Sequence, residues 1–198
     1  MSDIRLLVIS GSSRTGSFNT KLAQVAASSA RAEGATVTEL DLVSLALPVY
    51  HGDIEAAGMP AGALALRELL TRHDALIVVS PEYNAFPTPL LINSFDWVSR
   101  PGAADGLPSG LAAMSGKVLG LLSASPGNLG GLRSLMFVRQ FFHLALGMHI
   151  VPEQFALSQA AKAFDAQGQL LDAKHSDAVN RVVHATLRVA TAMKAAPV

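Results

Sequence analysis

The sequence IRLLVISGSSRTGSFNT, residues 4–20, passes from a short apolar run into a polar loop and then into a helical pattern. Short continuous apolar runs are typical of strands that are covered on both faces, as in a parallel sheet. The alternation continues along the chain and predicts one doubly wound α/β domain, a three-layer sandwich over residues 1–198. Strands are predicted at 4–10, 36–42 (weaker, and suited to a position nearer the sheet edge), 75–80, 118–124 and 148–152, and helices at 17–33, 61–72, 88–99, 130–146 and 176–193.

The composition limits the classes of function. Half of the 198 residues are hydrophobic, and 15 Lys and Arg balance 15 Asp and Glu. This neutral charge gives no field to gather nucleic acid or an anionic membrane, so neither is expected as a partner. The chain has no cysteine, and its six histidines form no metal-binding motif, so any redox chemistry requires a bound cofactor and no metal is predicted.

Two further patterns concern location. No apolar stretch approaches the roughly 20 residues that a spanning helix needs. The N-terminus runs directly into a strand pattern without the charged, apolar and cleavage regions of a secretory signal. We therefore expect a soluble, cytoplasmic protein.

The loop after the first predicted strand has the chemistry of an anion site. Gly11 permits a tight turn, hydroxyls and helix N–H groups can bind phosphate oxygens, and Arg14 adds a charged fork. The lysine of an NTP-binding P-loop and the second glycine of a dinucleotide fingerprint are both missing, so a terminal monophosphate fits better than a pyrophosphate. The alternative is that Ser17 only caps the following helix and the loop binds nothing.

Two other loops follow strands that end at the same edge of the predicted sheet. PEYNAFPTP, residues 81–89, offers a rigid backbone edge and aromatic contacts, which a flat heteroaromatic ring requires. It could equally be a proline-stiffened connector whose Tyr83 and Phe86 simply pack. SASPG, residues 123–127, superficially resembles a hydrolase nucleophile elbow, but Pro126 has no N–H for an oxyanion hole.

Together these segments resemble the NADPH-dependent FMN reductase family of flavodoxin-like quinone, chromate and azo-dye reductases. The resemblance rests on GSSRTGSFN (11–19), PEYN (81–84) with Pro87, Asn93 and Asp96-Trp97 after it, and SPGNLGG (125–131), and it covers nearly the whole chain. It implies a five-stranded parallel sheet with strand order 2-1-3-4-5 and non-covalently bound FMN. The cofactor-binding residues that we predict on this basis are Ser12, Arg14, Ser17, Phe18, Asn19, Thr20, Pro81, Glu82, Tyr83, Asn84, Ser125, Gly127, Asn128 and Gly130.

The resemblance also implies an activity. Such an enzyme would pass hydride from NADPH or NADH through FMN to a small acceptor such as a quinone, free flavin, azo compound or metal oxyanion. Hydride transfer demands no side-chain acid or base, so no catalytic residue is predicted. Two alternatives remain at this stage: a flavodoxin-type electron shuttle without a nicotinamide site, although the acidic docking face usual in shuttles has no counterpart in the sequence, and a nucleotide-binding regulatory domain.

Self-association is also predicted. The apolar segment PTPLLINSFDWV (87–98) and the 130–146 helix together suggest an interface, and the family usually forms dimers or tetramers. Phe137, Phe141 and Leu144 recur at helical spacing, which indicates core packing or a subunit interface. The chain departs from the family pattern at Ile92, where a lysine is common, and so lacks any ion pair which that lysine would make.

Overall fold

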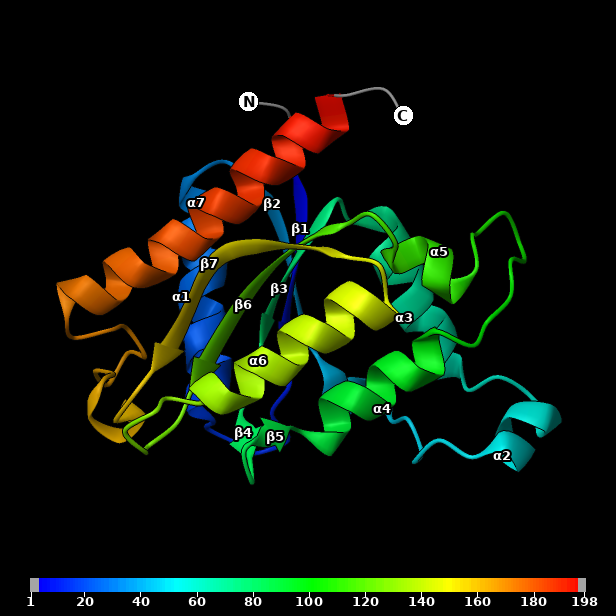
Figure 1. Cartoon of the computed structure of the whole chain (residues 1–198), viewed down its shortest axis with the longest axis horizontal. Helices are drawn as coiled ribbons and strands as arrows, with labels where there is room; N and C mark the ends of the chain where they lie inside the picture. The colour runs from blue at the N-terminus through cyan, green and yellow to red at the C-terminus, as the bar shows by residue number, and fades with distance from the viewer. Residues whose placement is uncertain (1–3, 196–198) are drawn as a thin grey trace.

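The computed structural model describes residues 4–195 and contains a five-stranded parallel sheet with the order β2-β1-β3-β6-β7 (Figure 1). Counted within this sheet the order is 2-1-3-4-5, so the predicted flavodoxin-like topology is confirmed. The alternating strand β2 lies at an edge, as its pattern predicted. Residues 1–3 lie outside the described residues. The expectation that the N-terminus carries no secretory signal rests partly on them. The strands are β1 (Arg5–Ser10), β2 (Thr36–Asp41), β3 (Ala75–Val79), β6 (Val118–Ala124) and β7 (His149–Leu157).

Helices cover both faces of the sheet and complete the three layers (Figure 1). The first and last helices, α1 and α7, pack together on one face, and α3, α4 and α6 cover the other. Among residues 4–195, no helix is both long enough and apolar enough to cross a membrane. The bounds are α1 (Phe18–Ala32), α2 (Gly52–Ala57), α3 (Ala61–Arg72), α4 (Pro89–Val98), α5 (Gly110–Met114), α6 (Leu132–Gln140) and α7 (Ala173–Ala195).

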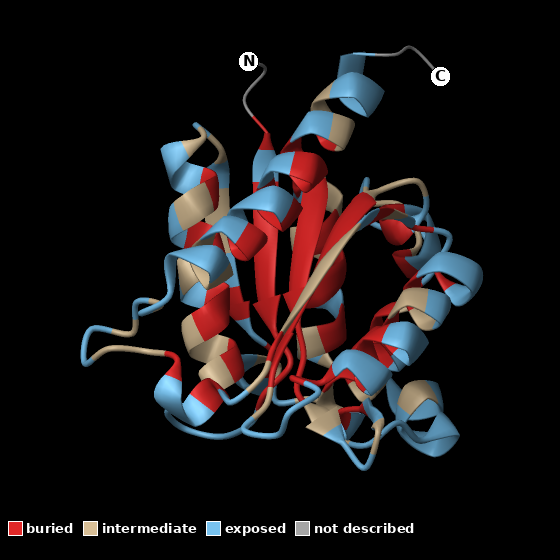
Figure 2. Ribbon diagram, turned by 60° about the vertical axis from the view of Figure 1, so that its left-hand side comes forward, coloured by how far each residue is buried: buried red, intermediate tan, exposed pale blue. Residues whose placement is uncertain are grey.

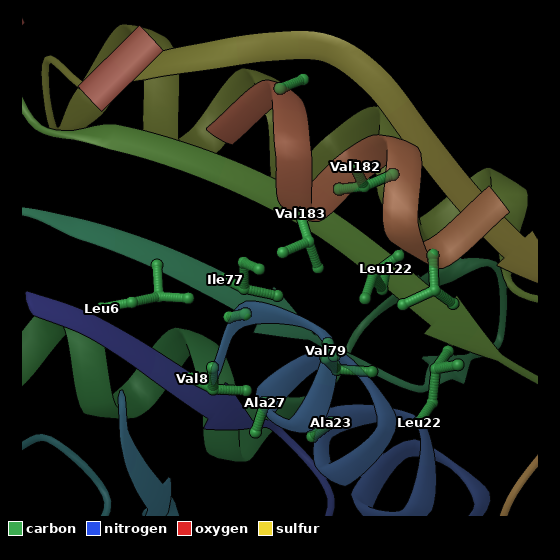
Figure 3. Packing of buried hydrophobic residues seen from close by; sticks show 14 of the residues in the cluster. Leu6, Val8, Leu22, Ala23, Ala27, Ile77, Val79, Leu122, Val182 and Val183 are labelled. Carbon is green, nitrogen blue, oxygen red and sulfur yellow. The ribbon is translucent and has the colours of Figure 1, made fainter. Parts of the chain in front are cut away.

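The two-residue period of the strands divides the core into two layers. Leu6 and Val8 of β1 belong to the cluster with α1 and α7, whereas Leu7 and Ile9 belong to the cluster with the opposite helices. Figure 3 shows Leu6 and Val8 in the same layer as Val183 of α7. Figure 2 shows the central strands buried between helices whose outer sides are exposed. Because both faces of the sheet are covered, polar groups can meet a ligand only where the strands end.

The last strand is longer than its apolar run indicated. We expected it to stop at Pro152, but β7 continues to Leu157. The pairing register with β6 shifts between Leu119, which pairs with Ile150, and Leu121, which pairs with Gln154. Pro152 lies in this irregular stretch. Proline is tolerated there because β7 is an edge strand. In the irregular stretch, no hydrogen bond to the neighbouring strand is needed from the N–H that proline lacks.

The helix predicted over 130–146 differs at both ends from the one in the structure. It begins at Leu132, because Gly130 and Gly131 adopt left-handed backbone conformations with φ of 62° and 94°. It ends in a π-helical turn, η2 (Phe141–Ala145). Short elements that lack a strong period were missed, as expected from their length. These are the 3₁₀ turns η1 (Leu42–Leu45) and η3 (Ala160–Lys162), helix α2, helix α5 in the Gly-, Pro- and Ala-rich segment 101–116, and a hairpin formed by β4 (Glu82–Tyr83) and β5 (Phe86–Pro87).

Candidate functional site

The loop between β1 and α1 forms an anion cradle. Ser17 is the N-cap of α1, and its hydroxyl accepts a hydrogen bond from the N–H of Asn19 at 3.1 Å. The hydroxyl of Ser12 accepts from the N–H of Arg14 at 3.4 Å. Ser12 and Ser17 are buried, whereas Arg14 is exposed and lies over the ring of Phe18, 5.1 Å from its centroid. Hydroxyls, the positive end of a helix and an exposed cation thus lie together.

Asn19 has a structural task in this loop. Its amide donates to the carbonyl of Ala124 at 2.8 Å and accepts from the N–H of the same residue, also at 2.8 Å. This two-point bond joins the start of α1 to the end of β6 across 105 positions of sequence. Asn19 was predicted as a cofactor ligand; the structure shows that it fixes the first loop against the end of β6.

The segment after β3 is a tight hairpin. Its two-residue turn, Asn84 and Ala85, has φ of 52° and 67°, which is the left-handed pair that a type I′ turn requires. Alanine adopts this conformation reluctantly, at a cost of about 1–2 kcal/mol. The hairpin is held next to the first loop because Thr88, which caps α4, donates to the carbonyl of Gly11 at 2.8 Å.

Glu82 joins the hairpin to α6. One carboxylate oxygen accepts from Nε of Arg133 at 2.9 Å and from a second guanidinium nitrogen, and the other accepts from the N–H of Ser134 at 3.1 Å. Burial alone would raise the pKa of Glu82. The bonds from Arg133 and Ser134 lower it by more than burial raises it, so the pKa lies below its usual value. The carboxylate is therefore ionised at neutral pH, and both of its oxygens are bonded within the protein.

The third loop, 125–131, is fastened to the end of β7. Ser125 donates its N–H to the carbonyl of Leu157 at 3.1 Å, and its own carbonyl accepts from Ala160 at 3.0 Å. The buried hydroxyl of Ser123 donates to the carbonyl of Gly130 at 2.6 Å. A Cβ on Gly130 would lie 2.6 Å from the carbonyl oxygen of Ala156, so the loop passes too close to β7 for any larger residue.

The three loops line one cavity of about 250 Å³ at the carboxyl edge of the sheet. Hydroxyl and cationic groups lie on the side of the first loop, and the hairpin backbone lies on the other, so the donor set fits a phosphate joined to a flat ring. The cavity brings together most of the predicted residues. Its lining is Ser12, Arg14, Ser17, Phe18, Asn19, Pro81, Glu82, Tyr83, Ala124, Ser125 and Pro126.

Five predicted residues do not line this cavity. The Thr20 hydroxyl is 3.0 Å from that of Ser10, and Thr20 lines a separate hollow with Glu39 and Asp41. Asn84 forms the hairpin turn, and Gly130 packs against β7. The other two, Gly127 and Asn128, lie in the exposed part of the third loop.

Sequence reasoning missed two contributors. Phe164, in the segment before α7, stacks on Phe18 with the rings 2° from parallel and their centroids 6.4 Å apart, and so covers the flank of the first loop. Arg133, the partner of Glu82, was also missed. Phe164 carries no local motif, and the arginine could have been found only by noting that a buried glutamate in the hairpin requires a cationic partner.

Known proteins are similar to this chain over most of its length. Residues 4–162 match the model of the family described as NADPH-dependent FMN reductase. An NAD(P)H-dependent FMN reductase of Pseudomonas aeruginosa is 34% identical over 184 residues, which are 92% of this chain and 93% of that protein. A quinone reductase of Pseudomonas putida is 35% identical over 167 residues, 83% of each chain.

A solved structure shares the whole architecture. FerB, a flavoenzyme NAD(P)H:(acceptor) oxidoreductase from Paracoccus denitrificans, superposes with a TM-score of 0.79 at 26% identity and covers 96% of this chain and 98% of its own. The loops of the candidate site all lie within the matched residues 4–162. The chain therefore belongs to the NADPH-dependent FMN reductase family.

Proposed function

We propose that residues 1–198 form a single-domain FMN-dependent oxidoreductase, which passes hydride from NADPH or NADH to a small acceptor such as a quinone, free flavin, azo compound or metal oxyanion. The observation that carries the proposal is the convergence of three loops, distant in sequence, on one cavity with hydroxyls and a cation on one side and the hairpin on the other. Relatives named quinone reductase favour quinones among the acceptors. We also propose that the enzyme works in the cytoplasm, where both nicotinamide donors are present.

Bound FMN supplies the hydride chemistry, and the protein binds, orients and shields it. Ser12, Ser17 and the first N–H groups of α1 are the groups proposed to hold the phosphate, with Arg14 adding charge. The hairpin backbone from Pro81 is proposed to lie along the ring edge. Tyr83 and Phe86 are both substantially exposed beside the cavity, which leaves an open approach for a donor and then an acceptor.

The proposed activity predicts that purified protein mixed with FMN and then desalted keeps the visible absorption of the flavin. NADPH or NADH added without oxygen should then bleach that absorption, and a quinone added afterwards should restore it. The control is the same amount of free FMN without protein. Flavin that is retained but not bleached by either nucleotide would point to a shuttle, and failure to retain flavin would contradict the proposal.

We further propose that the chain forms a dimer through the face built by the hairpin, α4, α6 and η2. Phe86 and Phe137 contact each other at 4.8 Å between centroids and are both exposed. Leu144 is 72% exposed, so the predicted stripe is not core packing at that position. Phe86, Ile92, Phe137 and other residues line an apolar groove of about 240 Å³. Ile92, at the position where the family commonly has lysine, therefore makes this face more apolar and suits a second copy of the chain.

Light scattering of the wild-type protein is expected to return at least twice the mass of the chain. Leu144→Glu should shift the population toward monomer, because a charge buried in an apolar interface loses its solvent without gaining a partner. Leu171→Glu is the matched control, since Leu171 is 66% exposed in the segment before α7, away from this face. A monomeric wild type, or equal effects of the two changes, would argue against the proposed face.

A further inference from the structure

The side chain of Glu82 lines the hairpin side of the cavity, but its carboxylate is bonded to other groups of the protein. Only 8% of this side chain is exposed, against 56% for that of Arg133. Its two oxygens accept three hydrogen bonds from Arg133 and Ser134, as described above. A carboxylate held in this way has little capacity left to bind another group, although PEYN was predicted as a cofactor-binding segment.

Glu82 also completes a helix that cannot cap itself. The N-cap of α6 is Gly131, which has no side chain, and no side-chain capping bond is formed there. Ser134 is the third residue of α6, and its N–H is one of those that a capping side chain normally satisfies. Glu82 supplies that acceptor from another loop, and its negative charge is stabilised by the positive end of the helix. The hairpin and α6 are therefore fixed by one side chain.

The pair also sets the charge of the cavity wall. An ionised carboxylate alone would oppose any further negative charge nearby, and an unpaired guanidinium would favour it. Bonded together, the two groups present a nearly neutral wall. The second hydrogen bond from Ser134 to this segment, from its hydroxyl to the carbonyl of Pro81 at 3.4 Å, holds the hairpin backbone in the same position.

We propose that Glu82 is a positioning residue and not a flavin ligand: with Arg133 it docks the hairpin on α6 and keeps the wall beside the flavin ring electrically neutral. The inference rests on the proposed function. Reduction of FMN by hydride adds negative charge to the ring, so the charge of this wall sets how readily the bound cofactor accepts electrons.

Variants that break the pair from either side should shift the reduction equilibrium of bound FMN in opposite directions. At pH 8 against a redox dye, Arg133→Met leaves a lone carboxylate, and the ratio of oxidised to reduced flavin should rise about tenfold. Glu82→Gln leaves a lone guanidinium, and the ratio should fall by a similar factor. Arg133→Lys keeps the charge, and the double variant Glu82→Gln with Arg133→Met removes both charges, so both should stay within about twofold of wild type.

The control is Glu68→Gln, which removes an exposed carboxylate paired with Arg72 on α3 and changes the net charge by the same amount. Shifts of the same sign in the two single variants, or an equal shift in the control, would overturn the inference. A loss of packing alone would move both single variants in the same direction. Wild-type protein that retains no FMN would instead refute the proposed function, and this inference with it.

A readout without flavin tests the capping role separately. Hydrogen exchange of the Ser134 amide in the FMN-free protein should accelerate at least tenfold in Glu82→Ala, and much less in Glu82→Gln, whose side-chain oxygen can still accept the bond. Equal exchange in Glu82→Ala and wild type would show that Glu82 does not hold α6, and would overturn the inference even if FMN binds normally.

Discussion

Ser17→Asp is expected to weaken FMN binding at least 100-fold while leaving the fold as stable as before. Ser17 is buried, lines the cavity and caps α1 through its side-chain oxygen. Aspartate is an equally good N-cap, and its charge is favourable at the start of a helix by about 0.3–1 kcal/mol. The same charge would lie beside the cofactor phosphate, where each pair of like charges costs on the order of 4 kcal/mol at contact distances near a protein surface.

The measurement is fluorescence titration of FMN together with urea unfolding of the FMN-free protein. Ser17→Asn, a neutral cap of the same shape, should weaken binding much less. Ser109→Asp is the matched control, because Ser109 caps α5 through the same type of bond, to the N–H of Ala112. If Ser17→Asp bound FMN within tenfold of wild type, the phosphate would not lie at the start of α1.

Gly130→Ala is expected to lower the free energy of unfolding by about 3 kcal/mol or more. Its φ of 62° is unfavourable for alanine by about 1–2 kcal/mol. The new Cβ would also lie 2.6 Å from the carbonyl oxygen of Ala156, which belongs to β7 and is paired in the sheet opposite Ser123. The backbone cannot move away without breaking this pairing, so the overlap adds a packing cost of about 1–3 kcal/mol.

Gly127→Ala is the matched control from the same loop. Gly127 is exposed, lacks the left-handed conformation, and would place a Cβ at an ordinary 3.6 Å from the hydroxyl oxygen of Ser125. Its unfolding free energy should stay within about 0.5 kcal/mol of wild type. Urea unfolding with unchanged m-values gives both numbers, and similar values for the two variants would mean that Gly130 is not constrained by β7.

Most of the sheet could be predicted from sequence because its three central strands are buried on both faces. Runs such as 75–80 and 118–124 read as continuous apolar segments, and 36–42 as an alternating one, and each corresponds to a strand in the expected place. The continuation of β7 beyond Pro152 could not be predicted in this way. Its residues 153–156 are only partly buried, so their apolar pattern is weak.

The site was predictable as a set of loops but less so in the roles of single residues. Hydroxyls and a cation after β1 have local chemistry that indicates an anion, and Ser12, Arg14 and Ser17 do line the cavity. Asn19 and Glu82 have polar groups that would suit a ligand equally well, but both are bonded within the protein. Asn19 bonds the backbone of Ala124, 105 positions away, and Glu82 bonds the side chain of Arg133 and the N–H of Ser134, 51 and 52 positions away. Such bonds depend on the tertiary arrangement, which a local pattern does not contain.

The distance in sequence between these bonded residues determines how much of the chain must be synthesised before the site can bind FMN. The first loop is held by Ala124, and the third loop by Leu157 and Ala160. A nascent chain that has left the ribosome only as far as β3 has the phosphate loop but lacks Ala124, which bonds Asn19 in that loop. We therefore expect cofactor loading to wait until residues beyond η3 have emerged, so shorter ribosome-bound fragments should retain no flavin after excess FMN is removed.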